Sequence, residues 1–359
     1  MSNDSTQPMN KEKIAQAASR KAAFETQTFK PENKENKKNK LADIVVGLDG
    51  SDESFAALRW AMEEARHTGQ RVNAVFGWTR SWDMGEEPQS EADWSYLRKQ
   101  ITAQLSQWAH QIADEIGFDI EKLDITSKKA SGSSALIEIG KDAQQIVVGR
   151  RTLSRVARWF FGSVSANLVN ETKVPVTIVH WYALGDENEA VSNTIATQLQ
   201  TQTVGRIGTE HVGEEEILNA QLPVVVGIDG SECSMRALQF ALDSAAYTGR
   251  TINAMFCWQM KTIDKVLQTE AEIPSKEEAQ KLAEKFAKDF VAKADIPQGV
   301  KVETSAFHIT PQKGLLAASH YASRIIMGSR GLKGFNARFL GSVSRYLIDS
   351  ATCTTTIVH

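Results

Sequence analysis

Short apolar runs and amphipathic stretches alternate along the chain, and this alternation predicts strands and helices in turn. The run at 44–46 is continuous and β-branched, which is typical of a strand buried on both faces of a parallel sheet. Within 55–66, apolar residues recur three or four positions apart, which predicts a helix that Thr68-Gly69 ends. Further strands are expected at 72–78, 123–129, 145–149 and 174–179, and further helices at 97–116, 134–141 and from Ser163 onward.

The whole pattern occurs twice. Residues 43–54 read DIVVGLDGSDES and residues 223–234 read PVVVGIDGSECS, so that Asp229 follows Asp49 by 180 positions. The segments 68–78 and 248–258 match at the same offset, and 144–169 matches 323–348 at an offset of 179. Both copies close with Ile-Val-His. Matches in the same order at a nearly constant offset identify an internal duplication.

Strands that alternate with helices in each copy predict an α/β fold. We expect two tandem doubly wound domains, each a five-stranded parallel sheet with helices on both faces, in a Rossmann-like arrangement. Domain 1 is placed at 41–180 and domain 2 at 222–359. Residues 1–40 are polar with a local excess of basic side chains, which favours a disordered basic arm. Residues 181–221 have no stable period and are interpreted as a linker.

Composition narrows the class of protein. With 42% hydrophobic and 24% charged residues and a net charge of −3, the chain is typical of a globular protein, and nucleic acid is not an expected partner. No apolar run is long enough for a membrane helix, and the basic N-terminus lacks the apolar core of a secretory signal. The three cysteines fit neither a disulfide framework nor a zinc site, and the seven histidines show no metal spacing. We therefore expect a cytoplasmic protein with no metal site and no membrane partner.

The second copy carries a glycine loop suited to phosphate. Gly328 and Gly331 follow a predicted strand. Nine residues separate Gly331 from Gly341, which opens a helix together with Ser342. Such glycines let the backbone turn tightly and approach a ligand, and a helix N-terminus attracts phosphate. Asp229 is expected at the same sheet edge, where it could meet a ribose, a base or a metal. A Gly-Ser pair at a helix start is also an ordinary N-cap, so the functional interpretation depends on the complete spacing.

This spacing, Gly-x2-Gly-x9-Gly-Ser, resembles the signature of ATP-binding universal stress proteins, and the opening Gly-x-Asp-Gly-Ser at 227–231 fits the same family. The resemblance covers both copies. It implies ATP, with or without Mg, as the cofactor, and pairing of the domains through their fifth strands, either within one chain or as a homodimer. It also implies that Asp229 and the backbone around Met255 hold the adenosine end. The remaining nucleotide-binding residues that it implies are Met327, Gly328, Gly331, Gly341, Ser342, Val343 and Ser344.

The first copy departs from that signature, because Thr152 stands where the second glycine should be. A β-branched residue held at positive φ would cost about 1–3 kcal/mol, which would lower affinity by about tenfold to a hundredfold. The loop arginines Arg150, Arg151, Arg155 and Arg158 could contact phosphate or could form a solvated face. We expect nucleotide to be held mainly by domain 2. The second candidate site comprises Asp49, Val75, Val148, Gly149, Gly162, Ser163, Val164 and Ser165.

The leading hypothesis is an adenine-nucleotide-binding protein that acts as a cytoplasmic stress-response sensor or regulator. The signature supplies a phosphate cradle but no convincing general base, so a dedicated enzyme is not expected. Two alternatives stay open. One is a slow ATPase or phosphotransferase in which Asp229 helps to place a metal, and the other is a nucleotide-free scaffold whose paired domains bind a protein partner. Trp78 and Trp258, which recur at the same place, suit core packing and cleft lining equally.

Overall fold

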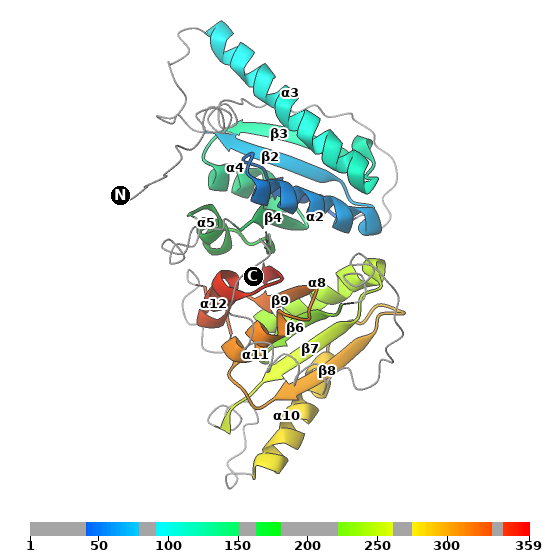
Figure 1. The fold of residues 1–359 in the computed structure, drawn as a ribbon. Coiled ribbons are helices and arrows are strands. Elements are labelled where there is room, and N and C mark those ends of the chain that lie inside the picture. The colour runs from blue at the N-terminus through cyan, green and yellow to red at the C-terminus, as the bar shows by residue number, and fades with distance from the viewer. Residues whose placement is uncertain (1–40, 79–90, 151–162, 181–221, 261–274, 332–339) are drawn as a thin grey trace, which may run out of the picture. The chain divides into compact units, whose positions relative to one another are not determined.

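The computed structural model describes residues 41–78, 91–150, 163–180, 222–260, 275–331 and 340–359 (Figure 1). These residues belong to two compact units, one within 1–149 and the other within 150–359. The expected arm at 1–40 and the expected linker at 181–221 lie outside the described residues, so both interpretations stay predictions.

The first unit is a parallel sheet with strand order β3-β2-β1-β4. Short 3-10 turns at Ile120–Lys122 and Gly140–Asp142 precede β3 and β4. Along the chain its elements are β1 (Ile44–Gly47), α2 (Asp52–Thr68), β2 (Val72–Trp78), α3 (Glu91–Ile116), β3 (Leu123–Lys129), α4 (Gly132–Ile139) and β4 (Gln145–Gly149).

The second unit has strand order β5-β10-β9-β6-β7-β8. All its neighbouring strands are parallel except β5 and β10, which are antiparallel. Along the chain its elements are α5 (Ser163–Glu171), β5 (Val176–Val179), β6 (Val224–Ile228), α8 (Glu232–Thr248), β7 (Ile252–Cys257), α10 (Lys276–Val291), β8 (Val302–Phe307), α11 (Pro311–Ala318), β9 (Arg324–Gly328), α12 (Ser342–Ser350) and β10 (Thr354–Val358).

The first helix of each copy begins and ends by the same local chemistry. The Ser51 side chain accepts from the amide of Ser54 at the start of α2, and Gly69 ends that helix with φ of 72°. The second copy repeats this at α8, where Ser231 is the N-cap and Gly249 has φ of 67°. A serine hydroxyl satisfies a free amide of the first turn, and only glycine adopts positive φ without strain. These signals are local, and they therefore recur wherever the sequence recurs.

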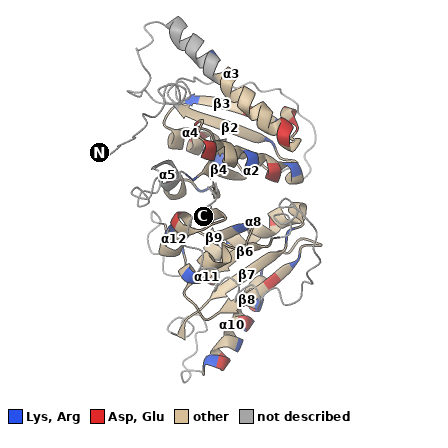
Figure 2. Ribbon diagram, viewed as in Figure 1, with Lys and Arg blue, Asp and Glu red and all other residues tan. Residues whose placement is uncertain are grey.

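Helices cover both faces of the sheet in the second unit. Alternate residues of β6 and β7, such as Val226 and Ala254, pack with α8 and α10 in one buried cluster. The other face meets α11, because a Cβ added to Gly227 would lie 3.0 Å from a methyl group of Leu315. Figure 2 shows that α10 carries charges of both signs on its surface. Helices on both faces of a mostly parallel sheet confirm the predicted α/β, Rossmann-like fold class.

Candidate functional site

The candidate site lies where the strand order of the second unit reverses. From β6 the chain proceeds through β7 to β8 on one side, and then crosses to β9 and β10 on the other side. Strands β6 and β9 are therefore parallel neighbours whose following loops diverge, and the register joins Gly227 to Met327 near their carboxyl ends. A crevice outside the carboxyl ends of two such strands is where open α/β sheets bind ligands. Asp229 and Gly328 come to this edge, as the sequence predicts.

The carboxylate of Asp229 is held by the turn that follows β6. Its Oδ1 accepts from the amide of Ser231 at 3.0 Å and from the hydroxyl of the same residue at 2.6 Å. The turn contains Gly230 at φ of 89°. The other carboxylate oxygen, Oδ2, lies 2.3 Å from the point where a Cβ on Gly331 would stand. Asp229 and Gly331 are distant in sequence, and the fold brings them into direct proximity.

Gly328 has a packing role that is independent of any ligand. A Cβ at this position would lie 2.7 Å from Cβ of Cys233 and 2.9 Å from its carbonyl carbon. The end of β9 thus packs in direct contact with the first turn of α8. In the first copy, a Cβ on Gly149 would lie 2.1 Å from the carbonyl oxygen of Glu53 in α2. Glycine at this position is therefore required in both copies by the contact between strand and helix.

Two hydrogen bonds join the N-terminus of α12 to the end of β9. The amide of Gly341 donates to the carbonyl of Ser329 at 2.8 Å, and the Ser344 hydroxyl donates to the carbonyl of Gly328 at 2.9 Å. Gly341 is the N-cap residue and supplies no side-chain acceptor. First-turn amides of a helix have no partner within the helix, and together with the helix dipole they attract anions. Ser342 is exposed in that first turn.

The remaining residues predicted for the second-copy site have different surroundings. Met255 lies within β7 between β6 and β8, and it is 1% exposed. Met327 lies within β9 and is also buried. Val343 lies in the first turn of α12 and is half-buried. The fold thus brings Asp229, the glycines and the start of α12 to one edge, whereas both methionines stay within their strands.

In the first copy the structure describes part of the second candidate site. Asp49 repeats the turn seen at Asp229, since its Oδ1 accepts from the amide of Ser51 at 3.0 Å. Val75 and Val148 are buried within β2 and β4. Ser163 begins α5, where Val164 and Ser165 follow. The side chains of these three residues lie outside the described part of the chain, as do Thr152 and Gly162.

Arg150 contacts a helix end. Its guanidinium donates to the carbonyls of Asp349 and Ala351, at the C-terminus of α12, and it lies 3.2 Å from Nδ1 of His180. A cation beside the last carbonyls of a helix is stabilised by the helix dipole. The structure thus shows a structural contact for Arg150, and a phosphate contact of this residue stays a prediction. Arg151, Arg155 and Arg158 lie outside the described residues.

Two equivalent, half-buried histidines follow the last strands, His180 after β5 and His359 after β10. Burial, reinforced by the charge of Arg150, lowers the pKa of His180 to about 3. Burial lowers the pKa of His359 to about 4, with Arg330 and Arg236 acting in the same direction. Neither Nε2 atom has a hydrogen-bond partner among the described residues. Both rings are therefore uncharged at neutral pH.

The other candidates from the sequence have structural roles where they are described. Trp258 is fully buried, donates from Nε1 to Gln280 at 3.0 Å and stacks on His308, so it belongs to the core. Burial raises the pKa of the Cys257 and Cys353 thiols to about 12. Cys233 accepts from Arg236 at 3.0 Å. The side chain of Trp78 lies outside the described part of the chain.

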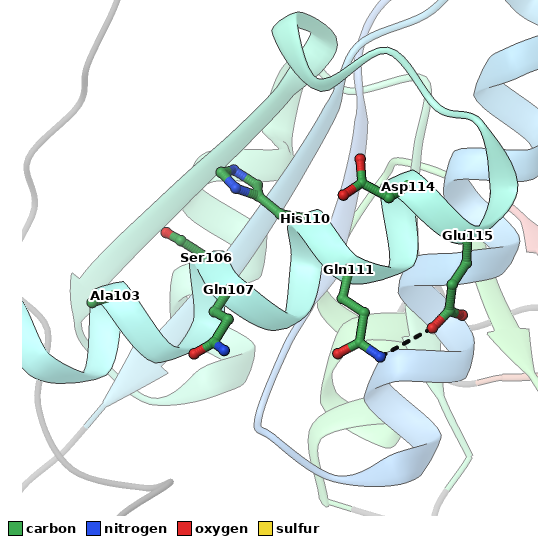
Figure 3. Close-up of a pocket in the computed structure, with 7 residues that line it drawn as sticks. All are labelled: Ala103, Ser106, Gln107, His110, Gln111, Asp114 and Glu115. Carbon is green, nitrogen blue, oxygen red and sulfur yellow. Dashed lines mark hydrogen bonds between the residues drawn. The ribbon is translucent and has the colours of Figure 1, made fainter.

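A shallow depression elsewhere on the molecule is distinct from this edge. It follows one exposed face of α3 in the first unit, where Gln111 donates to Glu115 at 3.1 Å (Figure 3). Over the described ranges, no three His, Cys, Asp or Glu side chains gather where they could hold a metal ion. None of the helices that the structure describes is both long and apolar enough to cross a membrane.

Comparison with known proteins gives a consistent result. A universal stress protein of Mycolicibacterium smegmatis is 29% identical over 322 residues, which cover 88% of this chain and 96% of that protein. A solved universal stress protein from Archaeoglobus fulgidus, 18% identical, covers 88% of this chain and 97% of its own with a TM-score of 0.53, a likeness of fold. A solved universal stress protein in complex with cAMP, 26% identical, covers 40% of this chain and 98% of its own with a TM-score of 0.31.

The chain also matches a family model in two places. The model of the universal stress protein family matches residues 41–180 and again residues 222–359. These two ranges coincide with the two copies of the duplication and together include most of the chain. The chain therefore belongs to the universal stress protein family.

Proposed function

We propose that this protein binds an adenine nucleotide, ATP in particular, at the edge formed by Asp229, the loop after β9 and the start of α12. The observation that carries the proposal is the approach of Asp229 Oδ2 to Gly331, where a Cβ would lie only 2.3 Å away. A backbone without a side chain beside a carboxylate leaves room for a sugar hydroxyl and for phosphate oxygens. The residues present therefore fit a nucleotide.

Each part of the edge has a distinct task in this proposal. The first-turn amides of α12, with the Ser342 hydroxyl, would bind phosphate oxygens. The hydrogen bonds from Gly341 to Ser329 and from Ser344 to Gly328, at and just after the end of β9, fix the direction of those amides. Asp229 would accept from a ribose hydroxyl, because the turn at Ser231 already orients its carboxylate. Mg²⁺, where it accompanies ATP, would take most of its ligands from phosphates and water.

The wider role that we propose is that of a cytoplasmic sensor or regulator of the stress response rather than a dedicated catalyst. The groups at this edge position a ligand, and none of those described there is a residue poised to activate water. We further propose that domain 1 (41–180) and domain 2 (222–359) pair through their fifth strands. The antiparallel register of β5 on β10 supports this pairing.

The nucleotide proposal is tested by measuring nucleotide released per chain when the freshly purified protein is denatured. Ser342→Asp puts a carboxylate in the first turn of α12, where it favours the helix but repels phosphate. Ser163→Asp makes the equivalent change in the first copy and is the matched control. We expect about one nucleotide per wild-type chain, the same for Ser163→Asp, and a near-complete loss for Ser342→Asp.

Other outcomes of this experiment are equally informative. Loss only in Ser163→Asp would place the working site in the first copy and refute the assignment to domain 2. Absence of nucleotide from every form, with no binding of added Mg-ATP, would refute nucleotide binding and favour a scaffold. Conversion of ATP to ADP that Asp229→Ala abolishes would favour an ATPase.

A further inference from the structure

Two equivalent threonines lie at the centre of the contact between β5 and β10. Thr177 and Thr356 occupy the same position in the two copies, are fully buried, and have hydroxyl oxygens 2.9 Å apart. The register joins Thr356 to Thr177, Thr355 to Ile178 and Ile357 to Val176. Because residues 355, 356 and 357 correspond to 176, 177 and 178, this register is unchanged when the two strands are exchanged. The threonine pair therefore lies on a local two-fold axis.

One buried cation breaks this symmetry. Arg324 of β9 is 2% exposed. Its Nε donates to the Thr356 hydroxyl at 2.6 Å, and its Nη2 donates to the Thr177 hydroxyl at 2.9 Å. The guanidinium also lies 5.3 Å from the centre of the Phe240 ring in α8, close enough for a cation–π contact. A single charged group thus bridges both hydroxyls.

The first copy carries a neutral residue at the corresponding position. Strand β4 reads QIVVG where β9 reads RIIMG, so that Gln145 is the equivalent of Arg324. Two second-copy strands paired in the same register would each bring an arginine to one pair of hydroxyls. Two buried guanidinium groups on shared neutral acceptors repel each other strongly, because the interior screens charge poorly. A first-copy strand brings no second cation.

We propose that Arg324 makes the edge strand β10 selective, so that it pairs with a first-copy strand and rejects a second β10. This inference rests on the proposed pairing of the two domains. Specificity of this kind is obtained by penalising the wrong partner as well as by favouring the right one. This selectivity would keep the assembly closed. If a second copy could also pair with another second copy, and a first copy with another first copy, each chain would offer two edge strands to other chains and open assemblies could form. When a first copy pairs only with a second copy, that pairing uses both edge strands.

A charge exchange in the full-length chain tests the proposal. Gln145→Arg gives the first copy the residue of the second, and from the equivalence of Gln145 and Arg324 we expect it to bring a second cation to the threonine pair. Gln145→Met is the matched control, since it removes the amide without adding charge. The double variant Gln145→Arg, Arg324→Gln restores a single cation. Hydrogen exchange of the amides of β5 and β10 reports on the contact directly, and the mass in solution is measured alongside.

We expect amide exchange in both strands to be about tenfold faster or more in Gln145→Arg, close to wild type in Gln145→Met, and restored in the double variant. Equal exchange in Gln145→Arg and wild type would overturn the proposal. Failure of the double variant to restore protection would overturn it too, because the defect would then reflect size and not charge. Unprotected β5 and β10 amides in the wild type would instead refute the pairing of the domains itself.

Discussion

Oδ2 of Asp229 lies 2.3 Å from the place where the Cβ of any residue other than glycine would stand at position 331. The two residues are about a hundred positions apart, and they meet because β6 and β9 are parallel neighbours with diverging loops. A glycine in that place keeps the carboxylate of Asp229 in the direction set by Ser231.

Gly331→Ala is therefore expected to displace Asp229 and to weaken nucleotide binding by about tenfold to a hundredfold. The position is exposed, so the global fold should tolerate the change. Titration calorimetry with ATP measures the affinity, and circular dichroism checks the fold. Thr152→Ala at the equivalent position of the first copy should leave the affinity of the second-copy site unchanged. Binding by Gly331→Ala as tight as wild type would contradict the proposed use of Asp229.

Gly328→Ala is expected to lower stability. Its Cβ would lie 2.7 Å from Cβ of Cys233 and 2.9 Å from its carbonyl carbon, and rotation of a side chain can relieve neither contact because the backbone of α8 fixes both atoms. We expect a loss of about 1–3 kcal/mol in the free energy of unfolding. Urea denaturation measures it. Gly249→Ala serves as a comparison, because a Cβ there meets nothing within 4 Å and the cost comes only from φ of +67°.

The two neutral histidines predict a dependence of stability on pH. Their ordinary pKa is 6.5, but in the folded protein the pKa of His180 is about 3 and that of His359 about 4. Below pH 6.5 the unfolded chain therefore binds protons that the native state does not. Stability should be full above pH 6.5 and should fall as the pH drops toward 4, by at most about 1.4 kcal/mol per pH unit for each histidine.

Urea denaturation at pH 7 and at pH 5 measures this slope above the range in which ordinary carboxylates titrate. The double variant His180→Gln, His359→Gln should lose most of the slope between those two values. An unchanged slope in the variant would show that other groups cause it.

Arg150→Met is expected to lower the stability of the protein and to leave nucleotide binding unchanged. The variant keeps an apolar stem but removes the hydrogen bonds to the carbonyls of Asp349 and Ala351 at the end of α12. We expect a loss of about 1–2 kcal/mol in stability. The amount of nucleotide released per chain should stay the same. The opposite pattern, full stability with nucleotide lost, would mean that this guanidinium serves the ligand.

Much of the fold could be predicted because its signals are local. The strand predicted at 145–149 is β4 without change, and the glycine stop after Thr68 is the left-handed cap of α2. Two helices begin earlier in the structure than the sequence predicts. Helix α2 begins at Asp52 rather than at 55, and α4 begins at Gly132 rather than at 134. In both cases the first turn after the capping serine is polar or small, so apolar periodicity alone does not reveal it.

The candidate site was predictable in its residue types but not in its contacts. Spacing predicted Asp229 and the glycine loop as candidates, because a phosphate cradle requires glycines and a helix start in a fixed order. Spacing could not reveal that Gly328 is required by α8, or that Arg150 contacts the carbonyls of α12. Those facts depend on which helix packs on which strand, and chain order does not specify it.

The sequence by itself determined the duplication, the α/β class and the family. Repeated motifs and periodicity are properties of short segments, and they can be recognised without knowing which segments pack together. Only the tertiary structure decided that Thr177 meets Thr356, that Arg324 bridges both, and that Oδ2 of Asp229 lies beside Gly331. Each of these relationships joins residues far apart in the chain. Register and packing bring them together, and both depend on how whole strands and helices bury their surfaces.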